Sequence, residues 1–239
     1  MTPPLFLVDT EGLQTGRVVV DGDEGRHASD VRRLRAGEHV LLGDGCGRIG
    51  DGNVVAVTRG SIEVDVSSVR GVPAPRPRFV VAQALAKAGR DEDAVEAMTE
   101  VGVDAVLGWQ AARSVAKWAD RTQTRWSATV RAAAKQARRA YVPTVTGPLT
   151  TAALAERAAG ATLAVVLHED ATEPLVSLAF PDDGEVLVVV GPEGGISPEE
   201  LDALTAAGAI PCRLGPNVLR TSTAGVAALS VLSAATRWC

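Results

Sequence analysis

The sequence predicts an α/β protein of two domains, in which a small β-domain precedes a larger domain built on a parallel sheet. Its 239 residues exceed the length of most single domains, which usually run to about 100 to 200 residues. Residues 17–69 alternate short β-branched runs with turn residues, whereas strand-like and helix-like stretches alternate from Phe79 onward. The proline-rich segment between them favours an extended tether. We therefore expect domains at residues 1–72 and 79–239, joined by a linker at residues 73–78.

The first domain is expected to be a small antiparallel barrel or sandwich, because its strands are short and turn residues separate them. A short helix over His27–Leu34 interrupts the strands and carries a group of arginines. The predicted strands are Val18–Val20, Glu38–Leu42, Val54–Thr58 and Ile62–Val66.

The second domain alternates buried strands with helices, the pattern of a parallel sheet. Ser197-Pro198-Glu199-Glu200 has the residues of a capping box, with Ser197 as N-cap, Pro198 in the first helical position and Glu200 reaching back. The predicted strands are Phe79–Ala84, Ala105–Leu107, Thr162–Leu167, Glu185–Val190 and Ala209–Leu214, and the predicted helices are Asp91–Glu100, Arg121–Arg139, Leu149–Ala159, Pro198–Ala207 and Ser222–Ala235.

Two glycine-bearing segments, Gly191–Gly195 and Leu214–Thr221, each lie between a predicted strand and a predicted helix. Glycine lets a ligand approach the main chain, and the following helix offers unpaired N–H donors, so the pair predicts a small-molecule pocket built from backbone. A phosphate-binding P-loop is excluded, because Ile196 and Ser197 follow where Lys and Ser or Thr are needed. The formal G-x-G-x-x-G at residues 45–50 precedes a β-branched run, and we interpret it as a hairpin turn.

The net charge of −5 argues against a nucleic-acid partner only when the whole chain is averaged. Residues 111–145 hold eight Lys or Arg against the single acid Asp120, a local balance of +7, and Arg26, Arg32, Arg33 and Arg35 form a second cluster. Solvated helix faces are the alternative explanation for any one of these residues. No apolar run is long enough to span a bilayer and the N-terminus lacks an export-signal layout, so a cytoplasmic protein is expected.

The cysteines Cys46, Cys212 and Cys239 are odd in number and far apart. This pattern favours reduced thiols and gives no reason to expect a disulfide framework or a metal site.

The paired signatures identify a family. Val190–Ser197 followed by Leu214–Thr221 resembles the two signature stretches of the 16S ribosomal RNA (uracil-N3)-methyltransferase family, which belongs to the knotted SPOUT methyltransferases. The likeness covers nearly the whole chain in order, since it extends to His27–Leu34, Gly43–Gly45, Glu100–Val103, Gln136–Pro143 and Leu167–Glu169.

The resemblance implies a PUA-like β-barrel for RNA, followed by a SPOUT-type α/β domain with a deep trefoil knot. It also implies a homodimer, with S-adenosylmethionine held in the knot loops. The implied reaction transfers the methyl group to N3 of one uridine in 16S rRNA, either as free RNA or in the assembled 30S subunit. A binding protein that keeps this fold without turnover, and a metabolic enzyme that binds a nucleotide, are the competing hypotheses.

The catalytic candidates are Arg220 and Glu193. A cation beside the uracil oxygens would stabilise the charge that develops during attack by N3, although Arg220 could instead pair with a helix-end carboxylate. Glu193 could accept the proton, bind the cofactor, or brace its turn through backbone N–H groups. The expected cofactor-binding residues are Leu167, His168, Glu169, Gly191, Pro192, Glu193, Gly194, Gly195, Leu214, Gly215, Asn217, Leu219, Arg220 and Thr221.

For RNA, we expect phosphate contacts from six basic residues and recognition of an exposed base. Three positions depart from the family pattern: Asn217 replaces a common Arg, Ser222 a common Glu, and Ala97 a common Lys. The departure at Ser222 leaves the proton acceptor open. The six expected RNA contacts are Arg32, Arg33, Arg113, Lys117, Arg138 and Arg139.

Overall fold

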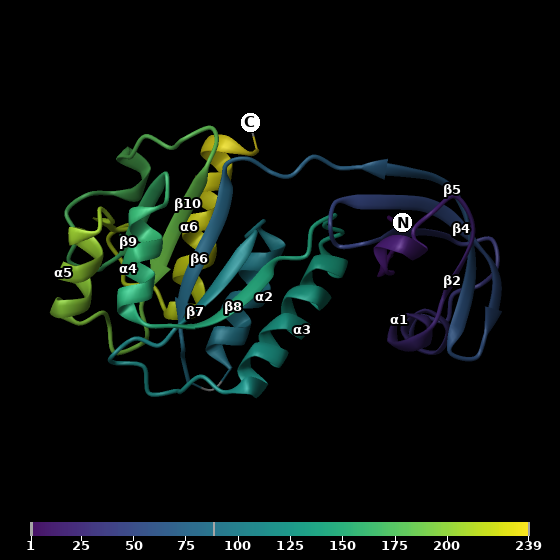
Figure 1. Cartoon of the computed structure of the whole chain (residues 1–239), viewed down its shortest axis with the longest axis horizontal. Coiled ribbons are helices and arrows are strands. Elements are labelled where there is room, and N and C mark those ends of the chain that lie inside the picture. The colour runs from purple at the N-terminus through teal and green to yellow at the C-terminus, as the bar shows by residue number, and fades with distance from the viewer. Residues whose placement is uncertain (1, 88, 239) are drawn as a thin grey trace. The chain divides into compact units, whose positions relative to one another are not determined.

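The computed structural model describes residues 2–87 and 89–238 and divides into two compact units (Figure 1). The first unit runs from the N-terminus to Ala74 and also includes Ala134–Val142. The second comprises Pro75–Ala133 and the chain from Pro143 onward. The sequence predicted a single break near residues 73–78 and did not anticipate that a later segment returns to the first unit.

The first unit is built on one five-stranded sheet with the order β1-β3-β4-β5-β2. Its pairs are antiparallel except for the parallel pair of β1 and β3, which the sequence did not predict. Strand β1 has only three residues, too few to show a period. The strands are β1 (Leu5–Leu7), β2 (Gly16–Val20), β3 (His39–Gly43), β4 (Arg48–Thr58) and β5 (Ser61–Gly71).

One hydrophobic core serves this sheet, because Phe6 of β1 and Val18 of β2 at its two edges pack in the same cluster as Val40 and Val64 in its middle. The hairpin predicted at Gly45–Gly50 is confirmed, since the segment joins antiparallel β3 and β4. The carboxylate of Asp44 stabilises this turn by accepting from the backbone N–H groups of Cys46, at 2.7 Å, and Arg48, at 3.0 Å.

The helix predicted over His27–Leu34 begins earlier and ends earlier, as α1 (Gly22–Arg26) continued by a π-helical turn, η2 (His27–Val31). A short 3-10 turn, η1 (Thr10–Gly12), precedes β2. Gly25 explains the close packing of α1, because a Cβ there would lie 2.4 Å from the carbonyl oxygen of Gly60.

The returning segment follows α3 (Asp120–Gln136), which ends before the predicted residue 139. Beyond it, Tyr141 pairs with Cys46 as an antiparallel bridge, and its hydroxyl donates to the carbonyl oxygen of Val72 at 2.9 Å. Ring and backbone contacts of this segment with the β3–β4 turn explain why it belongs to the first unit.

The second unit contains a six-stranded sheet with the order β11-β9-β10-β6-β7-β8, and every pair is parallel as predicted. The sequence missed β8, whose residues are half-buried or exposed and include Gly147 and Pro148. Its strands are β6 (Arg78–Ala84), β7 (Ala105–Trp109), β8 (Thr144–Leu149), β9 (Leu163–Leu167), β10 (Glu185–Val190) and β11 (Ile210–Cys212).

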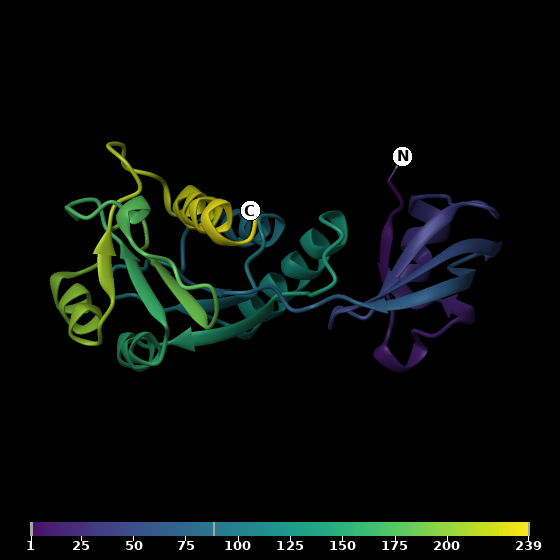
Figure 2. The same cartoon turned by 90° about the horizontal axis from the view of Figure 1, so that it is seen from above.

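Helices cover both faces of this sheet (Figure 2). Leu154 of α4 (Thr151–Ala159) and Leu204 of α5 (Pro198–Ala206) pack with Val80 and Val189 on one face. The opposite face carries α2 (Arg90–Glu100) and α6 (Thr221–Thr236), which contact each other, and a 3-10 turn, η3 (Leu175–Ser177), follows β9. The helix predicted from Leu149 begins at Thr151, because Leu149 ends β8. Among the described helices none has the length and hydropathy needed to cross a membrane.

Candidate functional site

A cavity of about 770 Å³ lies at the carboxyl ends of β9, β10 and β11, where the loops that follow these three strands meet. Its volume falls within the range of small-molecule sites, about 300 to 1,000 Å³. In open parallel sheets, ligands bind at this edge, close to the point where the strand order reverses. From β6 the chain adds β7 and β8 on one side, and it adds β9, β10 and β11 on the other side. The strand order therefore reverses between β6 and its neighbour β10.

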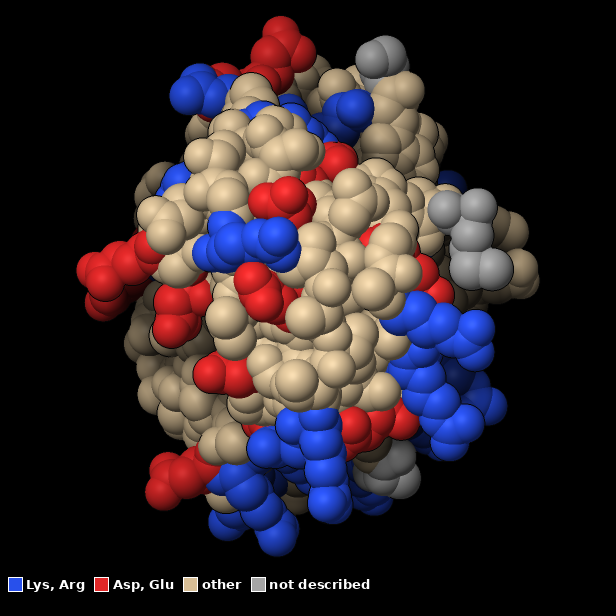
Figure 3. Space-filling model, turned by 90° about the vertical axis from the view of Figure 1, so that its right-hand side faces the viewer, with Lys and Arg blue, Asp and Glu red and all other residues tan. Residues whose placement is uncertain are grey.

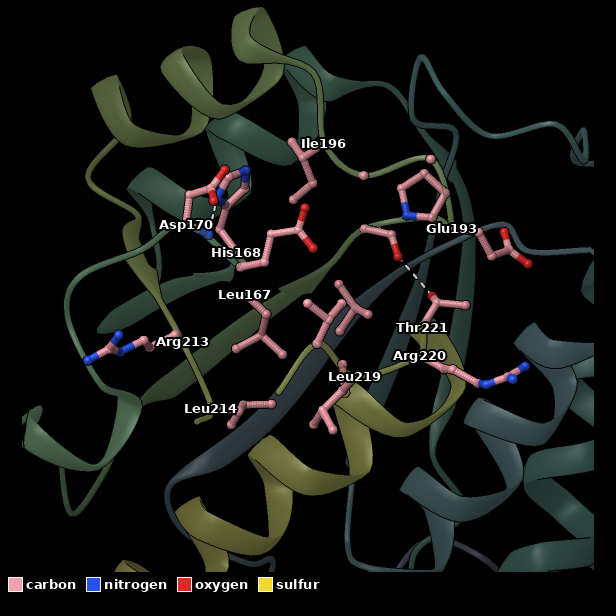
Figure 4. Close-up of a pocket in the computed structure, with 18 of the residues that line it drawn as sticks. Leu167, His168, Asp170, Glu193, Ile196, Arg213, Leu214, Leu219, Arg220 and Thr221 are labelled. Carbon is pink, nitrogen blue, oxygen red and sulfur yellow. Dashed lines mark hydrogen bonds between the residues drawn. The ribbon is translucent and has the colours of Figure 1, made fainter. Parts of the chain in front are cut away.

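The structure brings together all the residues expected to bind a cofactor. Leu167, Leu214 and Leu219 lie in the middle of the pocket, and Glu193 and Arg220 lie on the side opposite His168 (Figure 4). An apolar centre with polar groups at its margins is the usual composition of such a site. The lining includes Leu167, His168, Glu169, Gly191, Pro192, Glu193, Gly194, Gly195, Leu214, Gly215, Asn217, Leu219, Arg220 and Thr221.

The second glycine loop offers its backbone to the pocket. Across the part of the chain that the structure describes, no N–H or C=O group of Leu214–Leu219 forms a hydrogen bond. Leu214 is half-buried and residues 215–219 are exposed, so these backbone groups are open to a bound molecule. Helix α6 begins directly afterwards, at Thr221, and its first N–H groups add further donors.

The first glycine loop is a tight turn with a fixed exit. Gly195 has a φ of +74° and its N–H donates to the carbonyl oxygen of Pro192 at 2.9 Å. The predicted capping box is confirmed: Ser197 Oγ accepts from the Glu200 N–H at 3.3 Å, and Glu200 Oε2 accepts from the Ser197 N–H at 3.1 Å. Glu200 is buried, and its Oε1 also accepts from the N–H of Ala112 at 2.8 Å, which ties the loop after β7 to the cap.

Glu193 has the bracing contact that the sequence left as an alternative. Its Oε1 accepts from the backbone N–H of Lys87 at 3.1 Å and lies 3.4 Å from Nη1 of Arg90. Arg220 differs, because it is the exposed N-cap residue of α6 and its guanidinium forms no hydrogen bond or ion pair with any described residue. The helix-end carboxylate suggested as a partner for Arg220 is therefore not observed within the described chain.

His168 is fixed in place at the end of β9. Its N–H donates to the carbonyl oxygen of Cys212 at 2.9 Å, and Nδ1 accepts from the N–H of Asp170 at 3.3 Å. This geometry agrees with its expected place as a lining residue.

Burial, followed by the nearby charge of Glu173, raises the pKa of the Cys212 thiol to about 11. Cys46 and Cys212 are free thiols, whereas Cys239 lies outside the described residues.

Arg113 and Arg138, two of the arginines expected to bind RNA, donate hydrogen bonds to backbone carbonyl groups of the protein. Nη1 of Arg113 donates to the carbonyl oxygen of Gly194 at 3.2 Å, so this side chain lines the pocket and supports the first glycine loop. Arg138 lies beyond α3 with a φ of 54°, and its Nε donates to the carbonyl oxygen of Pro3 at 2.8 Å. A basic helix extending through Arg138 and Arg139 is therefore wrong, because Gln136 is the last helical residue.

Basic side chains remain exposed elsewhere. Figure 3 shows several groups of Lys and Arg side chains exposed to the solvent. Arg32, Arg33 and Arg35 are exposed on the segment after η2, and Lys117 is exposed in the loop between β7 and α3. Arg139 is half-buried and has a partner.

Sequence reasoning missed several residues that line the pocket, and two of them left a signal. Ile196 directly follows Gly194-Gly195, and a Cβ on Gly191 would lie 2.7 Å from its Cγ1, so the isoleucine closes the turn. Arg90 begins α2, the helix that follows β6. Because the loops after adjacent parallel strands meet at one edge of the sheet, the start of α2 was to be expected beside the glycine loops. In residues 2–87 and 89–238 we find no group of three or more potential metal ligands.

The chain matches known RNA methyltransferases over most of its length. Residues 73–233 match the RNA methyltransferase domain family, and residues 20–67 match the RNA methyltransferase PUA domain family. Ribosomal RNA small subunit methyltransferase E of Mycobacterium tuberculosis is 51% identical over 248 residues, which cover 100% of this chain and 94% of the relative. The protein of the same name from Bacillus subtilis is 29% identical and covers 90% of this chain and 88% of its own.

Solved structures show the same architecture. A methyltransferase from Legionella pneumophila, solved with the bound cofactor SAM, has a TM-score of 0.88 and 28% identity, and the likeness covers 99% of each chain. A probable rRNA methyltransferase from Porphyromonas gingivalis has a TM-score of 0.81 at 28% identity, covering 97% of this chain and 99% of that one.

Proposed function

Because this chain belongs to the family of ribosomal RNA small subunit methyltransferase E, we propose that it methylates N3 of one uridine in 16S rRNA. The protein is an RNA methyltransferase of the small ribosomal subunit, and its cofactor is S-adenosylmethionine. The observation that carries the assignment is the meeting of both glycine loops in one cavity at the carboxyl edge of the sheet. The competing hypothesis of a metabolic enzyme is set aside, since the family match covers the whole chain.

The residues present fit this cofactor. The backbone groups of Leu214–Leu219 without partners suit the ring nitrogens and amino group of adenine, and the leucines in the middle of the pocket suit its flat faces. Glu169 lies exposed at the end of β9, where a carboxylate can accept hydrogen bonds from ribose hydroxyls. When bound, the cofactor supplies a methyl group on an already electrophilic sulfonium, so orientation and exclusion of water are the main tasks of the protein.

Arg220 is the residue we propose to act on the uracil. Neutral uracil carries a proton on N3, and the negative charge left by its removal spreads onto O2 and O4. A guanidinium with no partner of its own, held at the start of α6 beside the pocket, can donate to one of these oxygens as the charge develops. The exposure of Arg220 supports this role, because a substrate can reach the side chain.

Glu193 is the proposed proton acceptor. Its Oε1 is held by Lys87 and Arg90, whereas Oε2 accepts no hydrogen bond from any described residue. One carboxylate oxygen can therefore fix the side chain while the other faces a substrate. Ser222, where the family resemblance led us to expect Glu, offers no carboxylate for the same task.

We propose that the exposed residues Arg32, Arg33 and Lys117 contact RNA. Arg139, which is half-buried, is proposed as a weaker contact. Their charges would engage phosphates, while recognition of the target comes from RNA shape and from a uridine turned out of its stack. The match of residues 20–67 to an RNA methyltransferase PUA domain supports the involvement of the first unit.

The remaining features of the proposal come with the family. We propose a PUA-like barrel, a trefoil knot formed by the loops around the pocket, and a homodimer in the cytoplasm. Val218, 74% exposed, presents apolar surface in the loop beside the pocket, which supports coverage by a second subunit.

Mass spectrometry of small-subunit rRNA from cells that lack this protein tests the reaction. We expect one N3-methyluridine to disappear, to return with the wild-type chain, and to stay absent with Arg220→Ala. Arg213→Ala is the matched control, because Arg213 is an exposed arginine that lines the same pocket, and we expect it to restore the modification. An unchanged modification pattern in the deletion strain refutes the proposed reaction, and full restoration by Arg220→Ala refutes the role of Arg220.

A further inference from the structure

Gln83 is a fully buried amide in the middle of an apolar strand. It lies near the carboxyl end of β6, between β10 and β7, and its exposed fraction is 0%. Its neighbours Val81, Ala82 and Ala84 are apolar and equally buried. A polar side chain in such a position calls for a reason, because burial removes its hydrogen bonds with water.

The amide nitrogen of Gln83 connects the two glycine loops. Nε2 donates to Oγ1 of Thr221 at 2.8 Å and to the carbonyl oxygen of Ala84 at 3.1 Å. The hydroxyl of Thr221 in turn donates to the carbonyl oxygen of Gly191 at 2.8 Å, the bond drawn beside Thr221 in Figure 4. Thr221 ends the second loop and Gly191 begins the first, so one chain of hydrogen bonds joins β6 to both.

The same side chain carries a cost to stability. Within the described residues, the buried Oε1 of Gln83 has no hydrogen-bond partner. An unpaired buried acceptor destabilises a fold, whereas an apolar side chain of similar shape at this place would not. Stability therefore does not explain why position 83 carries a glutamine. The contacts of Gln83 with the two loops do explain it.

We propose that Gln83 is a positioning residue that sets the separation of the two glycine loops for cofactor binding. Because the Nε2–H group donates to a lone pair of the Thr221 hydroxyl oxygen, the hydroxyl proton points away from Gln83 and toward the carbonyl oxygen of Gly191. Without this donor, the hydroxyl can rotate and the loops lose a fixed connection at the base of the pocket. Gln83 does not line the cavity, so it acts through Thr221. The inference rests on the proposed cofactor.

The test compares stability with cofactor affinity in Gln83→Met. Methionine keeps the length of the side chain and removes both polar groups, so we expect the unfolding temperature of the apo-protein to stay equal or rise. We expect the Kd for S-adenosylmethionine, measured by calorimetric titration, to rise by about tenfold, the effect of one lost hydrogen bond at the upper end of its range. A purely structural role predicts the opposite pairing of a lower unfolding temperature and an unchanged Kd.

Ser233→Ala is the matched control. Ser233 of α6 is also fully buried with an Oγ that lacks a partner among the described atoms, and it does not line the pocket. Its removal should raise the unfolding temperature and leave the Kd unchanged.

A double-mutant cycle tests whether Gln83 acts through Thr221. If Gln83 acts through Thr221, the pair Gln83→Met and Thr221→Val should raise the Kd no more than Thr221→Val alone. Additive losses, or wild-type affinity in Gln83→Met, overturn the inference. A wild-type protein that fails to bind S-adenosylmethionine refutes the proposed function instead, so the two failures are distinguishable.

Discussion

Replacing Arg113 by Met separates two roles for a residue that charge density alone marks as an RNA contact. In the structure, Nη1 of Arg113 donates to the carbonyl oxygen of Gly194 at 3.2 Å and approaches that of Ile196 at 3.5 Å. A Cβ on Gly194 would lie 3.2 Å from the Cβ of Arg113, so the two backbones are also in close contact. We expect the substitution to loosen the first glycine loop.

The magnitude follows from these contacts. The 3.2 Å hydrogen bond has a charged donor, a class that contributes about 1.5–3 kcal/mol when buried. The Arg113 side chain is exposed, so we take the lower end of this range, and the 3.5 Å contact is too long to add a full bond. Without this bond, part of the binding free energy of S-adenosylmethionine is used to order the first glycine loop. A loss of about 1.4 kcal/mol corresponds to a tenfold weaker Kd.

Lys117→Met is the matched control, since Lys117 is exposed in the same loop and forms no hydrogen bond with any residue that the structure describes. Cofactor affinity comes from calorimetric titration, and rRNA binding is measured as a function of salt concentration. We expect Arg113→Met to weaken cofactor binding without changing the salt slope, and Lys117→Met to lower the slope by about one. Wild-type cofactor affinity with a lower salt slope in Arg113→Met would refute the reasoning.

Two further predictions concern stability and thiol chemistry. Arg237→Ala should lower the free energy of unfolding by about 3 kcal/mol, the lower end of the cost of breaking a buried ion pair. The Asp104 side chain is only 12% exposed and would lose the guanidinium, which also donates to the carbonyl oxygen of Pro77, while keeping the hydrogen bond from the Phe79 N–H. Urea titration measures the change, and a loss below about 1 kcal/mol would contradict the prediction. With its pKa raised to about 11, native Cys212 should hold roughly 0.1% thiolate at pH 8 and gain reactivity only as pH rises toward that value. Peptide mapping after iodoacetamide treatment at pH 8 should therefore find Cys46 labelled and Cys212 intact, and equal labelling in the folded protein would refute the prediction.

Predictions from the sequence succeeded where a local rule decides the structure. The central strands β6 and β10 are apolar runs of the right length, and they appear within a residue of their predicted bounds. The predictions from the sequence failed where contacts with distant parts of the chain decide the structure. Strand β8 has alternating half-buried and exposed residues and a proline, so its pairing with β7 left no clear local pattern. The end of α3 was overextended because the basic run continues past Gln136 without a helix breaker.

The sequence by itself determined the capping box at Ser197, the hairpin after β3 and both glycine loops, because each depends on the conformational preferences of a few adjacent residues. Only the tertiary structure decided the roles of Gln83 and Arg113. Gln83 meets Thr221 across 138 positions of the chain and Arg113 meets Gly194 across 81, so no local pattern can carry those contacts. The physical reason is that a buried amide or an arginine acquires its function from the partner that satisfies it, and parallel strands bring that partner from a distant part of the chain.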